Sequence, residues 1–149
     1  MADPKRILVV DDEDAVNIVL GELLRDAGYD VSIAMTCSEG ISQMETGGFD
    51  LVITDKNLPD DSGMEIVRKA RAMESGPEAV MITAYASLET AIEAMDLGAR
   101  GYILKPFDDI KEVLSKVEKI LAAADERRKM KNLIEQLRQS NEAAGERNK

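Results

Sequence analysis

The sequence RILVVDDED at residues 6–14 decides the fold, because a short aliphatic run stops at four consecutive acidic residues. A run of this length, bounded by polar residues, is typical of a strand that is buried on both faces. Similar apolar runs, one of them weaker, recur along the chain at residues 31–34, 51–54, 79–83 and 102–104.

Segments with the apolar spacing of amphipathic helices separate these runs. We expect the first helix to end at Gly28 and the fourth at Gly98, since glycine commonly terminates helices. The fifth is expected to begin near Asp108 and to run to about Ser140. Strand followed by helix, repeated along the chain, predicts an α/β fold. We expect a flavodoxin-like, doubly wound, five-stranded parallel sheet in the order 2-1-3-4-5, with an extended C-terminal helix.

The composition excludes several kinds of function. Histidine is absent from the 149 residues, so the chain has no histidine metal ligand and no histidine that could carry phosphate. The single cysteine, Cys37, rules out an internal disulfide and fits a reducing compartment. Residues 1–109 carry 22 acidic and 9 basic side chains, an excess that repels nucleic-acid phosphates. No apolar stretch approaches the roughly 20 residues that cross a bilayer. We therefore expect a cytoplasmic protein that binds neither nucleic acid nor a membrane.

Polar side chains follow four of the predicted strands at their carboxyl ends. Asp11 and Asp12 follow the first strand, Asp55 the third, Thr83 the fourth and Lys105 the fifth. In the expected strand order these ends meet where doubly wound folds bind ligands. Clustered carboxylates repel one another unless a cation compensates, and Mg²⁺ is a hard ion that prefers oxygen ligands. The set predicts a phosphoryl-accepting carboxylate, with Asp55 as nucleophile and with metal, lysine and hydroxyl neutralising the phosphoryl oxygens.

Each of these residues also has an ordinary structural interpretation. An acidic run such as residues 11–14 is often a solvated turn or a helix cap. Asp55 alone could form a turn before Pro59, Thr83 could be a hydroxyl at a strand end, and Lys105 a surface charge. Their joint occurrence at successive strand ends favours a functional site over coincidence.

In these motifs the sequence resembles the response-regulator receiver domains of two-component signalling, over residues 6–121. Receivers carry an acidic pair, a phosphoacceptor followed by proline and glycine, a Thr-Ala or Ser-Ala pair, and an aromatic residue before Lys-Pro. The stretch 83–107 is most similar to receivers of sigma-54-dependent transcription activators. In chain order, the matching residues are Asp11-Asp12, DKNLPDDSG at residues 55–63, Thr83-Ala84, Tyr102 and Lys105-Pro106.

The resemblance implies a metal site and a phosphoacceptor. Asp55 would accept the phosphoryl group. Asp12 and Asp55 would bind Mg²⁺ through their carboxylates, and Asn57 through its backbone carbonyl. Asp11 would act through a water molecule.

The resemblance also implies a conformational switch. Lys105 would contact the phosphoryl group, Thr83 would move to meet it, and Tyr102 would then turn inward. Ala84 would leave room for the phosphoryl group and for its donor. The Lys105–Pro106 bond is expected to be cis, which aims the lysine into the site and is cheap before proline.

By the same resemblance, a histidine kinase or a histidine phosphotransfer protein would supply the phosphoryl group. The chain would promote only its own phosphorylation and dephosphorylation, and would not be an enzyme with external substrates. The face formed by the fourth helix, fifth strand and fifth helix would control an output or partner.

Two other functions compete with this interpretation. A haloacid dehalogenase-like phosphatase also uses an aspartyl nucleophile, and residues 12–14 could mimic its Asp-x-Asp motif. That class needs a further acidic strand end after the lysine, where this chain offers only a helix. The other is a receiver-like module that binds partners without phosphorylation, which the intact set of motif residues argues against.

Helical character continues beyond the part that resembles receivers. We divide the chain into a receiver domain at residues 1–121, a helical extension at 122–140 that is a coiled-coil candidate, and a disordered tail at 141–149. Whether the chain is a complete receiver-plus-helix protein or part of a longer regulator stays open.

Two stripes can be traced on this last helix. The first, predicted to face the sheet, consists of Leu114, Val117, Leu121 and Ala124. The second alternates steps of three and four residues, the spacing of a coiled-coil seam, although two of its members are charged. It predicts a homodimer through the C-terminal helix, and the alternative is a frayed, monomeric tail. The second stripe consists of Val113, Lys116, Ile120, Ala123, Arg127, Met130, Ile134 and Leu137.

Overall fold

The computed structural model describes residues 3–107 and 109–147. Five strands run through these residues, namely β1 (Arg6–Val10), β2 (Asp30–Ala34), β3 (Leu51–Asp55), β4 (Glu78–Thr83) and β5 (Gly101–Leu104). They form one parallel sheet in the order β2-β1-β3-β4-β5, which confirms the predicted topology. Each strand extends one residue beyond the apolar run that predicted it.

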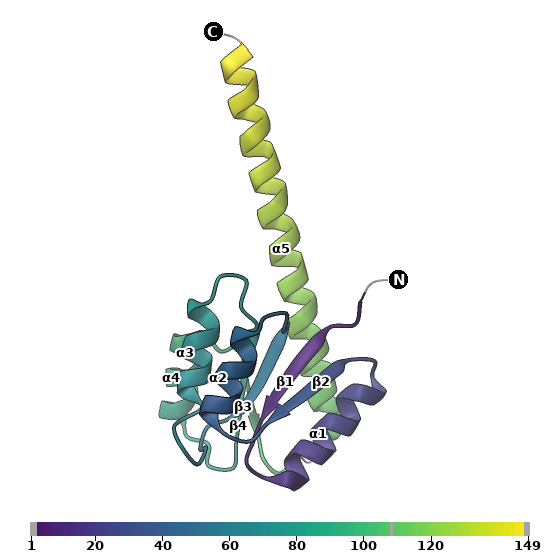
Figure 1. Ribbon diagram of the computed structural model, residues 1–149, viewed down its shortest axis with the longest axis vertical. Coiled ribbons are helices and arrows are strands. Elements are labelled where there is room, and N and C mark those ends of the chain that lie inside the picture. The colour runs from purple at the N-terminus through teal and green to yellow at the C-terminus, as the bar shows by residue number, and fades with distance from the viewer. Residues whose placement is uncertain (1–2, 108, 148–149) are drawn as a thin grey trace.

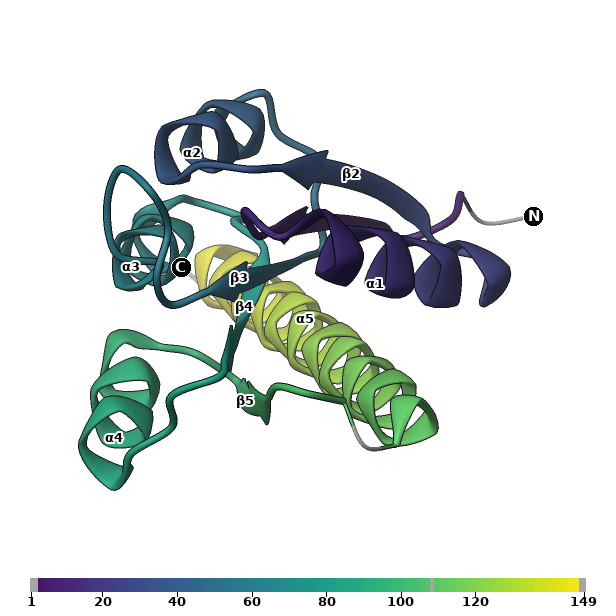
Figure 2. The same cartoon turned by 90° about the horizontal axis from the view of Figure 1, so that it is seen from below.

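Four helices connect the strands, and a fifth follows the last strand. They are α1 (Asp14–Asp26), α2 (Cys37–Glu45), α3 (Met64–Ala72), α4 (Leu88–Leu97) and α5 (Ile110–Arg147). Helices α1 and α5 lie against one face of the sheet, and α2, α3 and α4 lie against the other (Figure 1, Figure 2). This is the doubly wound arrangement that alternating strands and helices predict.

The strands supply both halves of the core, because successive side chains point to opposite faces. Ile7 and Val9 of β1 pack on the side of α1 and α5, whereas Leu8 and Val10 pack on the side of α2 and α3. All four are completely buried. The near-continuous apolar strands therefore have the two-sided burial that we inferred from their sequence.

Helix α4 differs from the other helices on its face of the sheet. Its apolar residues predicted a helix correctly, but Leu88 is 77% exposed, Ile92 51% and Met95 45%. Ala94 is its buried residue. Much of the apolar side of α4 therefore faces solvent, although Leu97 packs partly against the core, and Leu88 lines a groove together with the exposed Leu104.

Helix α5 begins on the sheet and leaves the domain as one uninterrupted helix (Figure 1). It continues to Arg147, so residues 141–147 are helical where we expected disorder; alanine, glutamate and arginine in this segment favour a helix. Residues 148–149, and Asp108 at the expected start of the helix, lie outside the described residues.

The two predicted stripes of α5 need correction. Val117, Leu121 and Ala124 are buried as expected, but Val113 is also buried and Ile120 packs partly against the same core. The reason is that a helix lying on a sheet buries a band wider than a single row of residues. The apolar residues that stay exposed beyond the domain form what we call the distal stripe, which consists of Met130, Leu133, Ile134 and Leu137.

Ion pairs hold α5 where it leaves the sheet. Lys5 Nζ donates to Asp125 Oδ1 at 2.7 Å, and this hydrogen bond lowers the pKa of Asp125. Arg127 Nη2 donates to Glu78 Oε1 at 3.0 Å, and Arg100 Nε donates to the other oxygen of Glu78 at 3.0 Å. Arg127, which we placed in the seam, is therefore bound to the receiver part of its own chain. No helix in the described part of the chain is both long enough and apolar enough to cross a membrane.

Candidate functional site

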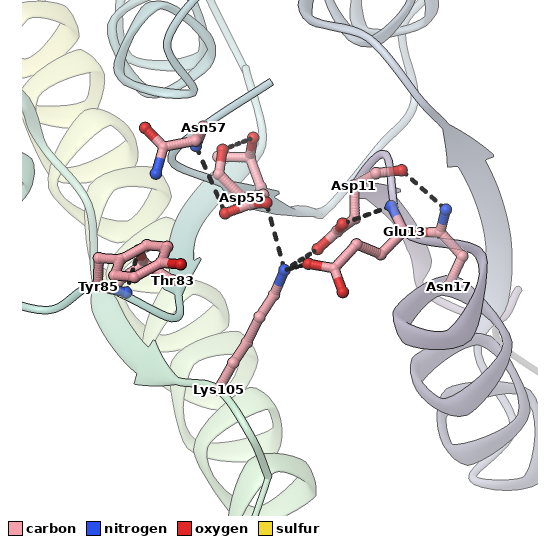
Figure 3. A network of polar contacts seen from close by, with 9 residues as sticks. Asp11, Glu13, Asn17, Asp55, Asn57, Thr83, Tyr85 and Lys105 are labelled. Atoms are coloured by element: carbon pink, nitrogen blue, oxygen red, sulfur yellow. Dashed lines mark hydrogen bonds and ion pairs between the residues drawn. The ribbon is translucent and has the colours of Figure 1, made fainter. Parts of the chain in front are cut away.

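The carboxyl ends of four strands meet at one edge of the sheet and bring the predicted site residues together (Figure 3). Asp11 directly follows β1, Asp55 ends β3, Thr83 ends β4, and Lys105 directly follows β5. Parallel pairing of β1 with β3 and of β3 with β4 sets these ends side by side. Asp12 lies next to Asp11 and is exposed.

Lys105 is the centre of the polar network. Its ammonium nitrogen lies 2.8 Å from Asp11 Oδ2, 2.9 Å from Glu13 Oε1 and 3.2 Å from Asp55 Oδ2. The lysine side chain is 8% exposed, so these ion pairs are poorly screened by water. One nearly buried ammonium group is therefore shared by three carboxylates.

The surroundings shift the pKa values of two of these groups. Burial disfavours the charged form of Lys105, but hydrogen bonds to Asp11 and Glu13 outweigh burial and raise the lysine pKa. Burial raises the pKa of Asp11, and the hydrogen bonds to Asp11 from Lys105 and from the Glu13 amide offset this only in part. The surroundings thus favour the charged form of Lys105 and disfavour the charged form of Asp11.

Asp11 is completely buried. Its Oδ1 accepts a hydrogen bond from the Glu13 amide at 2.8 Å, and its backbone carbonyl accepts one from Asn17 Nδ2 at 2.8 Å. Its Oδ2 contacts Lys105 as an ion pair but accepts no well-directed hydrogen bond from the described residues. The Lys105 ammonium therefore compensates the charge on this oxygen, and the oxygen keeps the capacity to accept from an ordered water.

The acidic residues at this edge fit a divalent cation. Asp11, Asp12, Glu13 and Asp55 can each present a carboxylate oxygen so that all lie within 4.8 Å of one another. Four carboxylates against the single ammonium of Lys105 leave an excess of negative charge. A hard ion with oxygen ligands is the chemical partner for such a set.

The loop after Asp55 closes tightly onto the end of β3. The Asn57 amide approaches Asp55 Oδ1 at 3.4 Å, a long hydrogen bond. Gly63, at the end of the loop, has no room for a side chain, because a Cβ there would collide with the backbone carbonyl of Asp55. The glycine of the motif is therefore required by close packing of the loop against the site.

A comparison with family models identifies the chain. The model of the response regulator receiver domain matches residues 7–118, which contain every site residue described above and all of the sheet except Arg6. The chain belongs to the response-regulator receiver family.

Known proteins support this assignment. The receiver is 36% identical over 115 residues to the uncharacterized transcriptional regulatory protein YkoG of Bacillus subtilis, a match that covers 77% of this chain and 50% of YkoG. The chain thus spans about half the length of this curated relative.

Two solved structures are also similar to the receiver. A CheY-like response regulator receiver domain protein from Methanospirillum hungatei is 36% identical with a TM-score of 0.78, and the match covers 83% of this chain and 98% of that chain. A response regulator protein from Burkholderia pseudomallei, described with a phosphorylated aspartic acid, a calcium ion and citrate, is 25% identical with a TM-score of 0.71. That match covers 86% of this chain and 75% of the Burkholderia chain.

The remaining predicted residues of the receiver lie on β4, β5 and the loops that follow them. Thr83 is completely buried, and its hydroxyl oxygen accepts a hydrogen bond from the Tyr85 amide at 3.1 Å. Ala84 and Tyr85 are exposed beside it. The Lys105–Pro106 peptide bond is cis, the geometry that the family resemblance implies.

Tyr102 of the receiver is tied to α4. Its hydroxyl lies 2.8 Å from Thr90 Oγ1, and Thr90 forms a capping box with Ser87 at the start of α4. The side chain that is expected to switch is therefore bonded to the first turn of the helix beside it.

Sequence reasoning missed two residues of the site. Glu13 shares Lys105 although 92 residues separate them, and Asn17 supports the backbone of Asp11 from the first turn of α1. The spacing of Asn17, six residues after Asp11 in a short strand-to-helix turn, was an available signal for the second. An exposed acid such as Glu13 carried no signal that distinguished it from its neighbours.

Proposed function

We propose that this receiver accepts a phosphoryl group on Asp55 in a Mg²⁺-dependent reaction, from the phosphohistidine of a histidine kinase or a histidine phosphotransfer protein. The observation that carries the proposal is the buried ammonium of Lys105, in contact with both Asp55 and Asp11. Because these 149 residues contain no histidine, the phosphohistidine has to lie outside them.

In the proposed step, a carboxylate oxygen of Asp55 attacks the phosphorus in line with the leaving imidazole. The O–P bond forms as the N–P bond breaks, and the imidazole nitrogen takes up a proton from solvent. Lys105, which contacts Asp55 Oδ2, would follow the transferred group and neutralise one of its oxygens. The hydroxyl of Thr83 would neutralise another. The product is an acyl phosphate, and later hydrolysis would restore the carboxylate.

We propose Asp12, Asp55 and the backbone carbonyl of Asn57 as the ligands of Mg²⁺, with Asp11 acting through a water molecule. Bound there, the ion would neutralise the carboxylate cluster and the incoming phosphoryl group. The burial of Asp11, which can present a carboxylate oxygen to the cluster with Asp12 and Asp55, supports its place beside the ion. The calcium ion and phosphorylated aspartic acid in the Burkholderia relative are consistent with the same chemistry.

The acceptor can be tested by intact-mass analysis with acetyl phosphate and Mg²⁺. Asp55→Asn keeps the shape of the side chain but is a poor nucleophile, so we expect the variant to fold and to gain no phosphoryl mass. Asp61→Asn makes the same change on the exposed surface and should label like the natural chain. Full labelling of Asp55→Asn would place the acceptor on another residue.

The metal can be tested with the same assay. Excess EDTA, or Asp12→Ala, should stop labelling, because uncompensated carboxylates repel the phosphoryl donor. Mg²⁺ should also raise the melting temperature, since a ligand that binds the folded chain stabilises it. Undiminished labelling in EDTA would overturn the metal assignment.

We further propose that phosphorylation changes the face formed by α4, β5 and α5, which then controls a partner or an output. A groove of about 620 Å³ lies on this face, lined by residues that include Leu88, Tyr102 and Phe107. Exposed apolar side chains of α4 border it. YkoG is called a transcriptional regulatory protein, so control of transcription through a longer chain or a partner is the output that we propose. A receiver of this kind would work in the cytoplasm.

We also propose that residues 122–147 form a helical extension that pairs the receiver with a second copy of itself. The distal stripe is about half-exposed at each of its four residues, on a helix segment that no other element covers among the described residues. Residues at steps of three, one and three form one continuous apolar band on a helix. A solitary helix of this length is marginal in water, and burying such a band in a pair would stabilise it.

Sedimentation equilibrium of the full chain tests this pairing. Ile134→Glu places a charge in the distal stripe and should shift the chain towards monomer. Gln136→Glu adds the same charge two residues away, at an exposed polar position, and should leave the association unchanged. If the natural chain is a monomer at high micromolar concentration, with and without beryllofluoride, the pairing proposal is wrong.

A further inference from the structure

The loop after the phosphoacceptor, residues 56–63, is closed at its base by its own backbone. Asn57 and Ser62 form an antiparallel bridge across it. The Gly63 amide donates to the Lys56 carbonyl at 2.7 Å. These contacts fix the two ends of the loop, and at its tip the Leu58 amide donates to the Asp61 carbonyl at 3.3 Å.

Asp60 fixes the tip by bonding to another helix. Its Oδ1 accepts a hydrogen bond from the Cys37 amide at 2.8 Å, and its Oδ2 accepts one from the Ser38 amide at 2.9 Å. These are the first two amides of α2, which a helix leaves without partners of its own. The third is taken locally, since the Glu39 amide donates to Thr36 Oγ1. The bonds from Ser38 and Cys37 lower the pKa of Asp60, so the clamp stays ionised.

Helix α2, in turn, is seated closely on the sheet. A Cβ on Gly40 would lie 3.0 Å from Val10 Cγ2 and 3.1 Å from Ile66 Cδ1, so the helix approaches the end of β1 as far as it can. Cys37 and Met44 are buried on the same side of α2. Val10 immediately precedes the acidic pair. Asp60 therefore ties the loop tip to α2, and α2 packs against the strand end that carries Asp11 and Asp12.

We propose that Asp60 is a positioning residue for the divalent cation, because it clamps the loop to α2 and so holds the Asn57 backbone in place before the ion binds. This inference rests on the proposed function, in which Asn57 supplies a ligand. A loop without the clamp keeps its internal hydrogen bonds but loses its attachment to α2, so the ion has to fix the position of the loop, and this cost weakens binding. Outer partners of metal ligands commonly change affinity without touching the metal.

The test measures Mn²⁺ binding to the full chain by the electron paramagnetic resonance of free Mn²⁺. Asp60→Ala should weaken binding roughly tenfold. It should raise the Mg²⁺ concentration for half-maximal labelling by acetyl phosphate by the same factor. The labelling rate at saturating Mg²⁺ should stay within about twofold of that of the natural chain. Without metal, the Cys37 and Ser38 amides should exchange faster. Asp60→Asn keeps one acceptor and should give an intermediate loss of affinity.

Asp61→Ala is the matched control, because Asp61 is also exposed and its side chain accepts only from the neighbouring Ser62 amide. It removes the same charge and should bind Mn²⁺ like the natural chain. Equal weakening by both alanine variants would mean a charge effect and would overturn the inference. Natural affinity in Asp60→Ala, with faster exchange at Cys37 and Ser38, would also overturn it. If the natural chain binds no Mn²⁺, the proposed metal site fails and the positioning role fails with it. If Asp60→Ala does not fold, Asp60→Asn decides the question by the same measurements.

Discussion

Helices α3 and α4 are neighbours of nearly equal length on the same face of the sheet, yet they are held in different ways. Helix α3 buries Met64, Ile66, Val67 and Ala70. Helix α4 buries Ala94 and turns its larger apolar residues to solvent. Much of the hydrophobic stabilisation that fixes α3 is thus absent from α4.

This difference in burial distinguishes the part of the site beside α3 from the part beside α4. Asp55 lies at the end of β3, which is completely covered and is followed by the closed loop and by α3. Thr83 and Tyr102 lie on β4 and β5, beside α4. A weakly held helix changes position at low cost, so the phosphorylation proposed above would need only modest differences in contacts to shift the population of α4 positions. The molecule thus combines a tightly packed strand end at Asp55 with a neighbouring helix that buries less of its apolar surface.

The largest expected effect comes from matched truncations in the two helices. Ile66→Ala should lower the free energy of unfolding by about 2–5 kcal/mol, because it empties a fully buried position. Ile92→Ala removes the same atoms from an exposed position and should change stability by no more than about 0.5 kcal/mol. Urea denaturation at neutral pH measures both. Similar losses would mean that α4 packs as tightly as α3.

A smaller effect is expected from the residues that cap the two helices. Ser87→Ala removes the acceptor for the Thr90 amide and should destabilise the first turn of α4 by about 1 kcal/mol. Ser62→Ala removes a similar acceptor, for the Met64 amide, at the start of α3. Amide exchange by NMR should become faster along α4 in the first variant, whereas burial should protect α3 in the second. Equal acceleration in both helices would contradict the difference drawn above.

The link between Tyr102 and α4 should have a weaker effect on stability. Thr90→Val keeps the shape of the side chain but removes the hydroxyl that bonds Tyr102 and that also accepts from the Ser87 amide in the capping box. Each of these partly exposed hydrogen bonds contributes about 0.5 kcal/mol. NMR of ring-labelled tyrosine should show a wider range of Tyr102 positions. Thr46→Val is the control, because the Thr46 hydroxyl bonds only to Gln43 in its own helix turn. Unchanged Tyr102 signals would show that the hydroxyl does not restrain the ring.

The stability of the fold should also depend on pH through Asp11, although the ion pair with Lys105 limits the size of the effect. Because burial raises the pKa of Asp11 in the folded chain, the stability contributed by its protonated form is present below about pH 3.8 and is lost as pH rises through the higher folded pKa. Asp11→Asn escapes that loss. In EDTA it should match the natural chain near pH 3.5 and exceed its melting temperature near pH 7. A lower melting temperature at pH 7 would mean that the Lys105 ion pair outweighs burial.

The sequence was sufficient to predict the sheet, because buried parallel strands appear as short, fully apolar runs. The carboxyl ends of such strands lie at the same edge of the sheet. The helices were harder. Which row of α5 faces the sheet depends on where the helix crosses the strands, so Val113 was placed in the wrong stripe and Leu133 was overlooked. The exposure of the apolar residues of α4 could not be predicted either. An amphipathic pattern shows that a helix has an apolar side but not which element covers that side.

The predicted site residues followed from strand ends, and the structure brings Asp11, Asp55 and Lys105 into direct contact. Glu13 and Asp60 could not be found in this way. Both are exposed acids in acidic stretches, and each owes its place to a partner far away in the chain, an ammonium group in one case and the start of α2 in the other. Contacts of this kind depend on tertiary geometry rather than on local pattern.

Because α5 is one uninterrupted helix, a rotation near the sheet would displace its far end. Its base is fixed to the starts of β1 and β4 by the pairs Lys5–Asp125 and Glu78–Arg127. Beyond Asp125 the helix extends about 30 Å, so each degree of rotation at the base moves the far end by about half an ångström. Small rearrangements at the sheet are thereby magnified into displacements comparable to a side chain. The direction of this helix would report the state of the domain to anything attached at its end.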